Sequence, residues 1–346
     1  MNYLEPCGQF GTRLMGGKDA SQTRYIFTRL TPDARKLFDP RDDPVLNYLQ
    51  DDGKSIEPEY FVPVIPTVLI NGTEGIGTGF STNIPPFNPR DIIDNMKRAL
   101  AGESIKKMKP WFKGFKGTLT EGETEQTWIT TGAYTMSGDI IRVTELPPTR
   151  WTQDYKEHLE TLVEKRIISG YTNTSTTDEV NFEVVGYSGS NLHRDLKLEK
   201  TFHTSNMHLF HPRRGIKKYH TAEDILVDFL EIRIDYYKAR KENMVESLEK
   251  LQVVLENKAR FVRMVTDEEL VVFKKKKVDL VEELIELNFV KIDDCFDYLL
   301  NIKTYQYTME EMEKLYTEAH KVIAELKNLK NTSVVSMYRS DLDMIM

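Results

Sequence analysis

Residues 221–255, which decide the architecture of the last third of the chain, read TAEDILVDFLEIRIDYYKARKENMVESLEKLQVVL. Apolar side chains recur there at helical spacing, for example at Ile225, Phe229 and Ile232. Thr221 and Asp224 form a pattern close to the S/T-x-x-E box that caps helices. The stretch therefore predicts a long amphipathic helix that begins just after Thr221.

A second helical pattern follows about fifty residues later, with apolar positions running from Met309 through Leu315 and Val322 to Leu329. Two long amphipathic helices at this separation favour an antiparallel pair that carries a small globular head at residues 265–305. Ordinary packing inside a helix bundle is the alternative explanation for such apolar stripes.

Upstream of these helices, the patterns predict an α+β arrangement. Asn88 and Pro89 suit the N-cap and first position of a helix that ends before Gly102. Helical spacing recurs at 151–167, and β-branched or alternating side chains predict strands at 126–134, 139–146 and 180–187. The first 66 residues form a mixed segment. The pattern at 25–37 predicts short helical turns interrupted by Pro32, and the segment ends in an extended apolar run at 61–70.

The bulk composition fits a soluble protein of more than one domain. The chain has 346 residues, of which 40% are hydrophobic and 29% charged. No apolar run approaches the ~18 residues that a membrane span needs, and the N-terminus MNYLEPCGQF lacks the pattern of a secretory signal. Cys7 and Cys295 match no metal-ligand spacing, which suits a reducing compartment without excluding others.

The net charge of −7 does not by itself favour a nucleic acid partner, but a binding groove needs only a local basic face. Three basic clusters supply such faces, and a solvated surface is the alternative explanation for each of them. Their members are Arg13, Lys18, Arg24, Arg29 and Arg35; Lys106, Lys107, Lys109, Lys113 and Lys116; and Arg213, Arg214, Lys217 and Lys218.

The Arg24-Tyr25 pair has the composition of a site for phosphoryl transfer to a phenol oxygen. The pKa of a tyrosine hydroxyl is near 10 in water, and neighbouring cations lower such a pKa. The same cations stabilise charge that develops on an attacked phosphate. Packing of an arginine on a tyrosine at the surface is the competing explanation, because such pairs are common.

Two glycine-rich loops stand out. Gly8, Gly11, Gly16 and Gly17 precede Arg24-Tyr25, and their backbone can approach a sugar-phosphate chain closely. The second loop, INGTEGIGTGF, holds Ile76 between glycines; an exposed apolar wedge of this kind opens a base step and bends DNA. Packing of Ile76 into the domain core is the alternative.

Other enzymatic patterns are weak. His203, His208 and His211 fit no zinc-site spacing, and residues 186–190 lack the GxSxG pattern. The pairs Asp42-Asp43 and Asp51-Asp52 are interpreted as turn residues rather than metal ligands.

Long blocks of the chain closely resemble the breakage-reunion region of eukaryotic-type (type IIA) DNA topoisomerase II. The two most specific blocks are GQFGTRLMGGKDASQTRYIFTRL at 8–30 and EPEYFVPVIPTVLINGTEGIGTGFSTNIP at 57–85. The similarity continues through VTELPPTRWTQDYKE, TTDEVNFEV, IKKYHTAEDILVDFLEIRIDYYKARKE and FDYLLNIKTYQYTMEE to SDLD at 340–343. It covers essentially the whole chain, and Thr23 and Met15 are its visible departures within the first block.

The resemblance implies an α+β fold in three modules. They are the C-terminal part of a winged-helix domain at 1–66, a mixed α/β tower domain at 67–220, and a long antiparallel coiled-coil arm with a helical C-gate head at 221–346. It implies that Tyr25 is the nucleophile that forms a 5′-phosphotyrosyl link, and that Arg24 binds the scissile phosphate. Ile76 matches the isoleucine that intercalates into the DNA, and Arg13 and Lys18 match positions near the DNA backbone.

The resemblance also implies partners outside this chain. Double-stranded DNA is the expected substrate, and a homodimer joined through the C-gate is the expected assembly. ATP and Mg²⁺ are expected cofactors of the full-length enzyme, held by the ATPase and TOPRIM domains of the same polypeptide, and no metal site is expected here. The expected location is the nucleus for a cellular eukaryotic enzyme, or the host cell or virion for a viral one.

Two kinds of function remain open on the sequence. The first is the DNA cleavage-religation segment of an ATP-hydrolysing topoisomerase, and the second is a DNA-binding and dimerising module without activity. An acidic EGDSA-like block and a DxD pair upstream would distinguish the first from the second.

Overall fold

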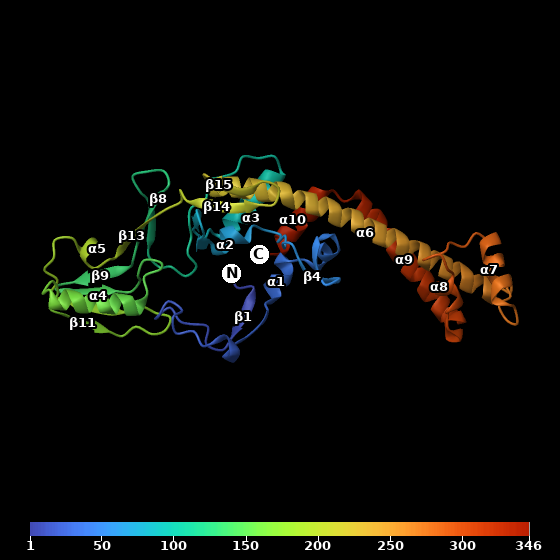
Figure 1. Cartoon of the computed structure of the whole chain (residues 1–346), viewed down its shortest axis with the longest axis horizontal. Helices are drawn as coiled ribbons and strands as arrows, with labels where there is room; N and C mark the ends of the chain where they lie inside the picture. Colours follow the sequence, from blue (N-terminus) through green and yellow to red (C-terminus); the bar gives the residue numbers. More distant parts are fainter. Residues whose placement is uncertain (346) are drawn as a thin grey trace. The chain divides into compact units, whose positions relative to one another are not determined.

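The computed structural model describes residues 1–345, apart from the side chain of Thr304, and divides them into two compact units. The first unit contains residues 1–39, 63–231 and the C-terminal end from Leu342. The second contains Pro40–Val62 and Ile232–Asp341. Each unit is assembled from segments that are distant in the sequence, and the elements are labelled in Figure 1.

The first unit begins with two antiparallel strands, β1 (Leu4–Cys7) and β2 (Phe27–Leu30), which pair from Leu4↔Leu30 to Cys7↔Phe27. A 3-10 turn, η1 (Thr23–Tyr25), precedes β2. Helix α1 (Pro32–Leu37) follows, capped by the Thr31 hydroxyl, which accepts a hydrogen bond from the Ala34 amide. The predicted helical turns at 25–37 form only in part, because 27–30 is the strand β2. Pro32 does not interrupt a helix but occupies the first position of α1, where no amide hydrogen is needed.

The apolar run at 61–70 is extended only as far as Pro66. From there α2 (Thr67–Asn71) forms one short helix, with Leu69 and Ile70 buried. Helix α3 (Pro89–Leu100) begins as predicted, with the Asn88 side chain accepting a hydrogen bond from the Arg90 amide at 3.0 Å.

Two hairpins lie side by side in this unit. The first is β5 (Thr73–Ile76) with β6 (Ser81–Ile84), and the second is β14 (Met207–His211) with β15 (Gly215–Tyr219). Hydrogen bonds join β6 to the start of β14, because the Asn83 amide donates to the Asn206 carbonyl and the His208 amide donates to the Thr82 hydroxyl.

The rest of the first unit contains two antiparallel sheets. The four-stranded sheet has the order β11 (Gly170–Asn173), β12 (Phe182–Val185), β10 (Ile140–Val143), β9 (Tyr134–Ser137). The three-stranded sheet has the order β13 (Glu199–His203), β8 (Thr127–Thr131), β7 (Thr118–Glu121). The three predicted strands are confirmed as β8, β10 and β12, each shorter than its sequence pattern.

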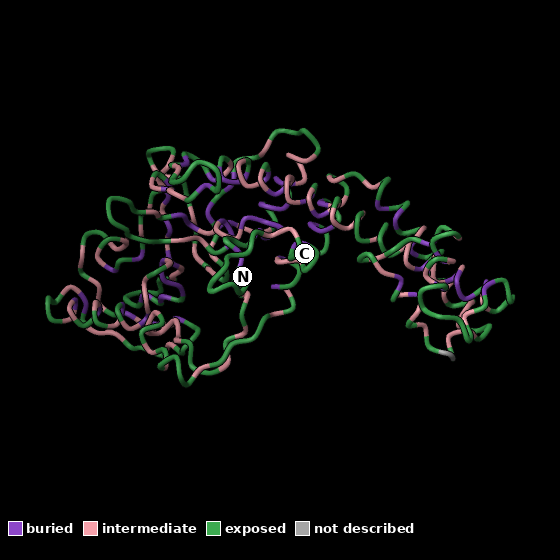
Figure 2. Tube along the Cα trace, turned by 45° about the vertical axis from the view of Figure 1, so that its right-hand side comes forward, coloured by how far each residue is buried: buried purple, intermediate pink, exposed green. Residues whose placement is uncertain are grey.

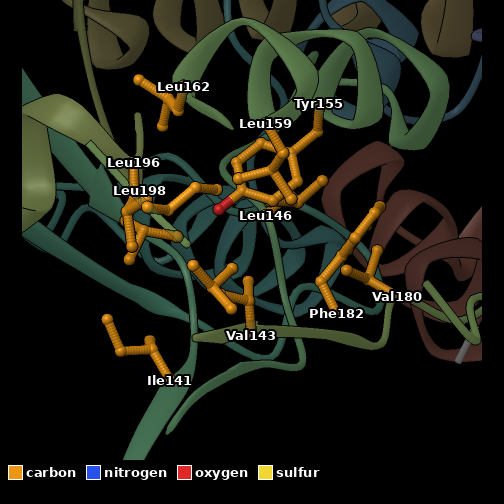
Figure 3. Close-up of a cluster of buried hydrophobic side chains, with 12 residues drawn as sticks. Ile141, Val143, Leu146, Tyr155, Leu159, Leu162, Val180, Phe182, Leu196 and Leu198 are labelled. Carbon is orange, nitrogen blue, oxygen red and sulfur yellow. The ribbon is translucent and has the colours of Figure 1, made fainter. Parts of the chain in front are cut away.

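Helix α4 (Thr152–Glu164) supplies one side of the core beside the four-stranded sheet. Tyr155 and Leu159 of α4 are fully buried and lie in one cluster with Val143 of β10 and Phe182 of β12 (Figure 3). The rings of Tyr155 and Phe182 meet edge to face, with centroids 5.1 Å apart. The short helix α5 (Leu192–Asp195) connects β12 to β13.

The second unit includes most of α6 (Ala222–Thr266) and α9 (Met309–Asn331). The predicted cap of α6 is present, because the Asp224 amide donates to the Thr221 hydroxyl while the Asp224 carboxylate accepts from the Thr221 amide. Leu255 packs with Ala319 and Val322, whereas Lys241 donates to the carbonyl of Lys330. The two helices therefore run antiparallel.

A separate apolar cluster lies where α6 ends. It contains α7 (Lys277–Glu286) and α8 (Asp297–Leu300), and η3 (Thr304–Tyr307) leads from it to α9. Leu280 and Leu284 are buried there with Phe261 of α6, and Val281 and Leu287 pack against them. The sequence predicts an apolar surface for a partner on the head, formed by Leu280, Val281, Leu284, Ile285 and Leu287. Only Ile285 is exposed, because the others pack in the cluster that contains Phe261 of α6.

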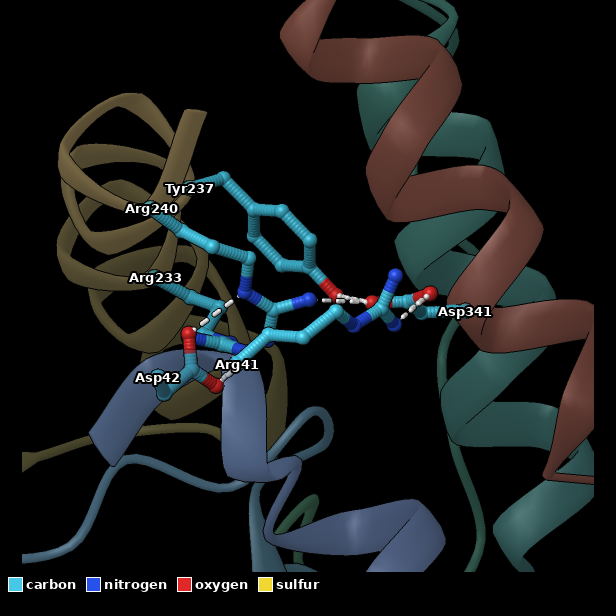
Figure 4. Close-up of polar contacts among 6 residues, drawn as sticks. All are labelled: Arg41, Asp42, Arg233, Tyr237, Arg240 and Asp341. Atoms are coloured by element: carbon cyan, nitrogen blue, oxygen red, sulfur yellow. Dashed lines mark hydrogen bonds and ion pairs between the residues drawn. The ribbon is translucent and has the colours of Figure 1, made fainter. Parts of the chain in front are cut away.

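A buried ionic network joins the short 3-10 helix η2 (Pro40–Val45) to α6 and α10 (Val334–Met344) within the second unit (Figure 4). The Asp42 carboxylate accepts hydrogen bonds from Arg233 at 2.7 Å and from Arg240 Nε at 2.6 Å. Asp341 accepts from Arg240 Nη1 at 2.6 Å and from the Tyr237 hydroxyl at 2.7 Å. The interpretation of Asp42 as a turn residue is wrong, because Asp42 is buried within the short helix η2 and its carboxylate balances two fully buried arginines.

The hairpin β3 (Tyr48–Asp51) and β4 (Lys54–Pro58) also belongs to the second unit. Asp52 and Gly53 join the two strands, both with positive φ. The interpretation of Asp51-Asp52 as turn residues is confirmed at Asp52.

Candidate nucleic-acid interface

The segment that carries Arg24 and Tyr25 is a long loop closed by the β1–β2 pair. No residue between positions 1 and 33 is buried, and the trace around the N-terminus is mostly exposed or half-buried in Figure 2. Its conformation therefore depends on hydrogen bonds and close backbone contacts rather than on a core of its own.

Asp19 holds this loop in shape. Its carboxylate accepts hydrogen bonds from the Thr12 amide at 2.9 Å, the Thr12 hydroxyl at 2.7 Å and the Gln9 side chain at 3.2 Å. The bond from the Thr12 amide is the main reason that the pKa of Asp19 lies below its ordinary value. At Gly11, where φ is +99°, an added Cβ would lie 2.5 Å from the Gly17 Cα, so a side chain is excluded there.

The loop is also fixed to the segment 143–153. A Cβ added at Gly16 would lie 2.5 Å from atoms of the Trp151 indole, and the Gln153 amide donates to the Leu14 carbonyl at 2.9 Å. Arg13 forms an ion pair with Glu145, whose side chain is 1% exposed. These contacts determine where the loop lies relative to α4 within the first unit.

Arg24 and Tyr25 lie together on the exposed side of this loop. The Arg24 guanidinium carbon is 4.9 Å from the centre of the Tyr25 ring, and the tyrosine is 62% exposed. Within residues 1–345, neither the guanidinium nor the Tyr25 hydroxyl has an ion pair or a side-chain hydrogen bond. A cation and a hydroxyl thus face solvent side by side, which is what a phosphodiester substrate requires of a tyrosine nucleophile.

Ile76 lies on a different hairpin, at the end of β5. Its side chain is 93% exposed, so the alternative that it packs into the domain core is wrong. The Gly77 amide donates to the Phe80 carbonyl at 2.8 Å and closes the turn that follows Ile76. Burial of a large aliphatic side chain is favourable, so its exposure at a fixed turn indicates a surface that contacts another molecule.

Most of the other predicted basic positions have acidic partners in the chain. Lys18 lies 3.6 Å from Asp154, Lys107 lies 3.4 Å from Glu121, and Arg29 pairs with Glu5. Arg13, whose charge Glu145 balances, has a structural role that sequence reasoning missed. Glu145 itself stands in the block VTELPPTRW, but nothing in its sequence context indicated that it would be buried.

In the part of the chain that the structure describes, no group of three or more His, Cys, Asp or Glu side chains is placed to hold a metal ion. The residues described therefore do not fit a Mg²⁺ site. No described helix is both long enough and apolar enough to span a bilayer.

Comparison with known proteins gives a consistent result. A family model for the DNA gyrase/topoisomerase IV A-subunit matches residues 1–343. DNA topoisomerase 2 of Plasmodium falciparum is 38% identical over 100% of the chain, and that of Arabidopsis thaliana is 39% identical over 99%. The chain spans 28% and 27% of the length of these two relatives.

A solved structure is similar throughout. The crystal structure of the Plasmodium falciparum topoisomerase II DNA-binding, cleavage and re-ligation domain matches with a TM-score of 0.91 and 38% identity. The match covers 100% of this chain and 52% of that one.

Proposed function

The chain belongs to the DNA gyrase/topoisomerase IV A-subunit family, and from that membership we propose that it carries the DNA cleavage and religation chemistry of an ATP-hydrolysing type II DNA topoisomerase. The observation that carries the proposal is the Arg24-Tyr25 pair, exposed on a loop that Asp19 and several close glycine contacts hold in shape. The fold match to a DNA-cleavage and re-ligation domain supports the same assignment.

In the proposed reaction, the Tyr25 hydroxyl oxygen attacks a DNA phosphorus. A bond forms between Tyr25 Oη and phosphorus, the bond from phosphorus to the 3′ oxygen breaks, and the protein becomes linked to the 5′ end. The phenol loses its proton to solvent, and the 3′ oxygen takes one up. Arg24 binds the phosphate and stabilises the negative charge that develops on it. Religation is the reverse reaction, which requires the loop to keep both ends near one another.

A covalent trapping experiment tests this chemistry. The longest form of the protein that carries this chain is mixed with Mg²⁺ and duplex DNA labelled at the 3′ end of one strand, because that end stays on the fragment joined to the protein; the mixture is then denatured, and the labelled peptide is identified. We expect label on Tyr25 and no adduct with Tyr25→Phe. Tyr305→Phe is the matched control, because Tyr305 is 60% exposed but lies in the second unit. Label on another tyrosine would contradict the proposal.

Ile76 is proposed as the side chain that opens a base step and bends the bound duplex. Its 93% exposure beside a closed glycine turn supports this role. Opening a step costs a few kcal/mol, which wider protein–DNA contact offsets. Ile76→Ala should therefore reduce the bend while the protein still binds DNA, which energy transfer between fluorophores on the two DNA ends measures. An unchanged end-to-end distance would contradict the assignment. Arg13 and Lys18 remain proposed backbone contacts, and both would have to exchange their carboxylate partners for phosphates.

We also propose the three-module division at residues 66 and 220, in which the antiparallel helices α6 and α9 are the arm and residues 265–305 are the C-gate head of a homodimer. Support comes from exposed apolar side chains around α7, of which Phe273 is 70%, Val278 66% and Ile285 49% exposed. Obligate two-fold interfaces are relatively hydrophobic. Sedimentation of the chain at micromolar concentration should give a dimer, and Val278→Glu should give a monomer; a dimer unaffected by the charge would count against the head as the interface.

The whole protein is proposed to use ATP and Mg²⁺ through ATPase and TOPRIM domains of the same polypeptide, and to act on double-stranded DNA. For a cellular eukaryotic enzyme, the proposed location is the nucleus.

A further inference from the structure

An exposed phenylalanine lies on the hairpin next to the one that carries Ile76. Phe210 in β14 is 82% exposed, a larger fraction than any other phenylalanine of the described chain. Side chains alternate between the two faces of a strand, and in β14 Met207 and His211 face inward and are buried. Phe210 therefore lies on the opposite, outer face, directly across from Ile216 of β15.

The inner face of the hairpin is fixed to the rest of the unit. Lys217 forms an ion pair with Asp228 at the start of α6, and His211 Nε2 lies 3.8 Å from the same carboxylate. The Tyr219 hydroxyl is also bonded to Asp228, and burial is the main reason that its pKa lies above the ordinary value. These anchors hold the strand in one orientation, so Phe210 is held in solvent rather than being free to turn inward.

Phe210 borders a shallow apolar hollow of about 360 Å³ that it shares with Ile76. Phe80 and Ile216 line the same hollow, as do the backbone atoms of Gly75 and Gly77. His208, on the same face as Phe210, meets the Phe80 ring at an angle, with ring centroids 6.1 Å apart. The hollow is therefore formed by two hairpins, one of which carries the side chain proposed to open the DNA.

We propose that Phe210 is a second apolar contact to the bent duplex, stacking on a nucleotide next to the base step that Ile76 opens. The inference rests on the proposed function of the chain. An aromatic side chain stacks on bases without regard to their sequence, and sugar rings present a similar apolar face. Exposed cations on the same hairpin can contact the phosphates of that nucleotide. Lys218 lies opposite His208 in the register of the two strands, and Arg214 lies at the turn. An apolar hollow with exposed cations beside it fits a nucleic acid strand, whose bases are apolar on their faces and whose phosphates are anionic.

The proposal predicts that Phe210 and Ile76 act on the same feature of the DNA. Phe210→Ala should weaken binding of a duplex that is bent in the complex by about tenfold, since loss of a stacked aromatic ring costs ~1–3 kcal/mol. It should also lower energy transfer between the DNA ends. The salt dependence of binding should not change, because the phosphate contacts are retained.

A double-substitution cycle gives the sharper test. Ile76→Ala and Phe210→Ala are made singly and together in the longest form of the protein, and binding and bending of the same duplex are measured. The effect of the double substitution on binding and bending should be smaller than the sum of the effects of the single substitutions. The reason is that neither Phe210 nor Ile76 has an opened base step to contact when the other side chain is missing. Met136→Ala is the control, since Met136 is 60% exposed in the same unit but lies on β9.

Three results overturn the proposal. Phe210→Ala could match Met136→Ala in binding and bending, its effect could add fully to that of Ile76→Ala, or it could lower thermal stability or dimerisation without changing the bend. In each of these cases, covalent attachment of Tyr25 to DNA would leave the proposed function intact. If the unsubstituted protein neither binds nor cleaves DNA, both proposals fail together.

Discussion

Asp42→Asn should destabilise the second unit by about 3 kcal/mol, because removal of one partner from a buried ion pair costs ~3–5 kcal/mol and the amide oxygen retains part of the hydrogen bonding. Arg233 and Arg240 are fully buried, and Asp42 accepts bonds from both of them. Burial alone would lower the pKa of Arg240, but its bonds to Asp42 and the neighbouring charges raise the pKa above the ordinary value. Arg240 nevertheless stays charged when Asp42 is neutralised, because a guanidinium is effectively always protonated and Asp341 still accepts a hydrogen bond from it.

The loss of stability can be measured by thermal unfolding, followed by circular dichroism at the helical minimum, because α6 and α9 dominate the helical content. At ~2–8 °C per kcal/mol for domains of this size range, the midpoint should fall by roughly 10 °C. Asp43→Asn is the matched control, since Asp43 is the next residue and is exposed, and surface substitutions usually change stability by less than about 0.5 kcal/mol. Equal midpoints for the two variants would refute the reasoning.

Three further predictions concern the first unit. Gly16→Ala should lower covalent attachment to DNA far more than Gly17→Ala. Both positions have positive φ, but only at Gly16 does the new Cβ meet the Trp151 ring. Equal trapping yields for the two variants would contradict the packing argument. The pKa of Asp19 is lowered by folding, so its contribution is present above the ordinary value of 3.8 and is lost as pH falls below it. The protection of the Thr12 amide, measured against its intrinsic exchange rate at each pH, should decrease there, and Asp19→Asn should remove this pH dependence. Burial lowers the pKa of His158, so the unfolding free energy should decrease as pH falls below 6.5, and a chemical-denaturation series with His158→Gln should show a flatter pH profile.

Features set by neighbouring residues were predictable from the sequence. The cap formed by Thr221 and Asp224 spans three residues, and the cap at Asn88 spans two, so each is specified by local chemistry alone. The long helices were predicted for a similar reason, because an apolar stripe repeats every turn. Strand positions were also predicted, although their ends were not, since sheet hydrogen bonding rather than side-chain pattern decides where a strand stops.

The candidate site was predictable in part. The resemblance pointed to Arg24, Tyr25 and Ile76, and the structure adds that all three side chains are exposed. The pairing of Arg13 with Glu145 could not be inferred, because 132 residues separate the two. The exposure of Phe210 was equally hidden, since β14 carries apolar side chains on both faces and its sequence does not reveal which face meets solvent.

The network around Asp42 has a consequence for the order in which the protein is made. Arg233 is translated 191 residues after Asp42, Arg240 198 residues after it, and Asp341 a further 101 residues later. At a synthesis rate of ~5–20 residues per second, Asp42 waits roughly 10–40 s for its first partner. Pro40–Val62 must therefore leave the ribosome without the segment it packs against. The second unit can complete its folding only after Asp341 has been translated, when all the strands of the first unit have already emerged.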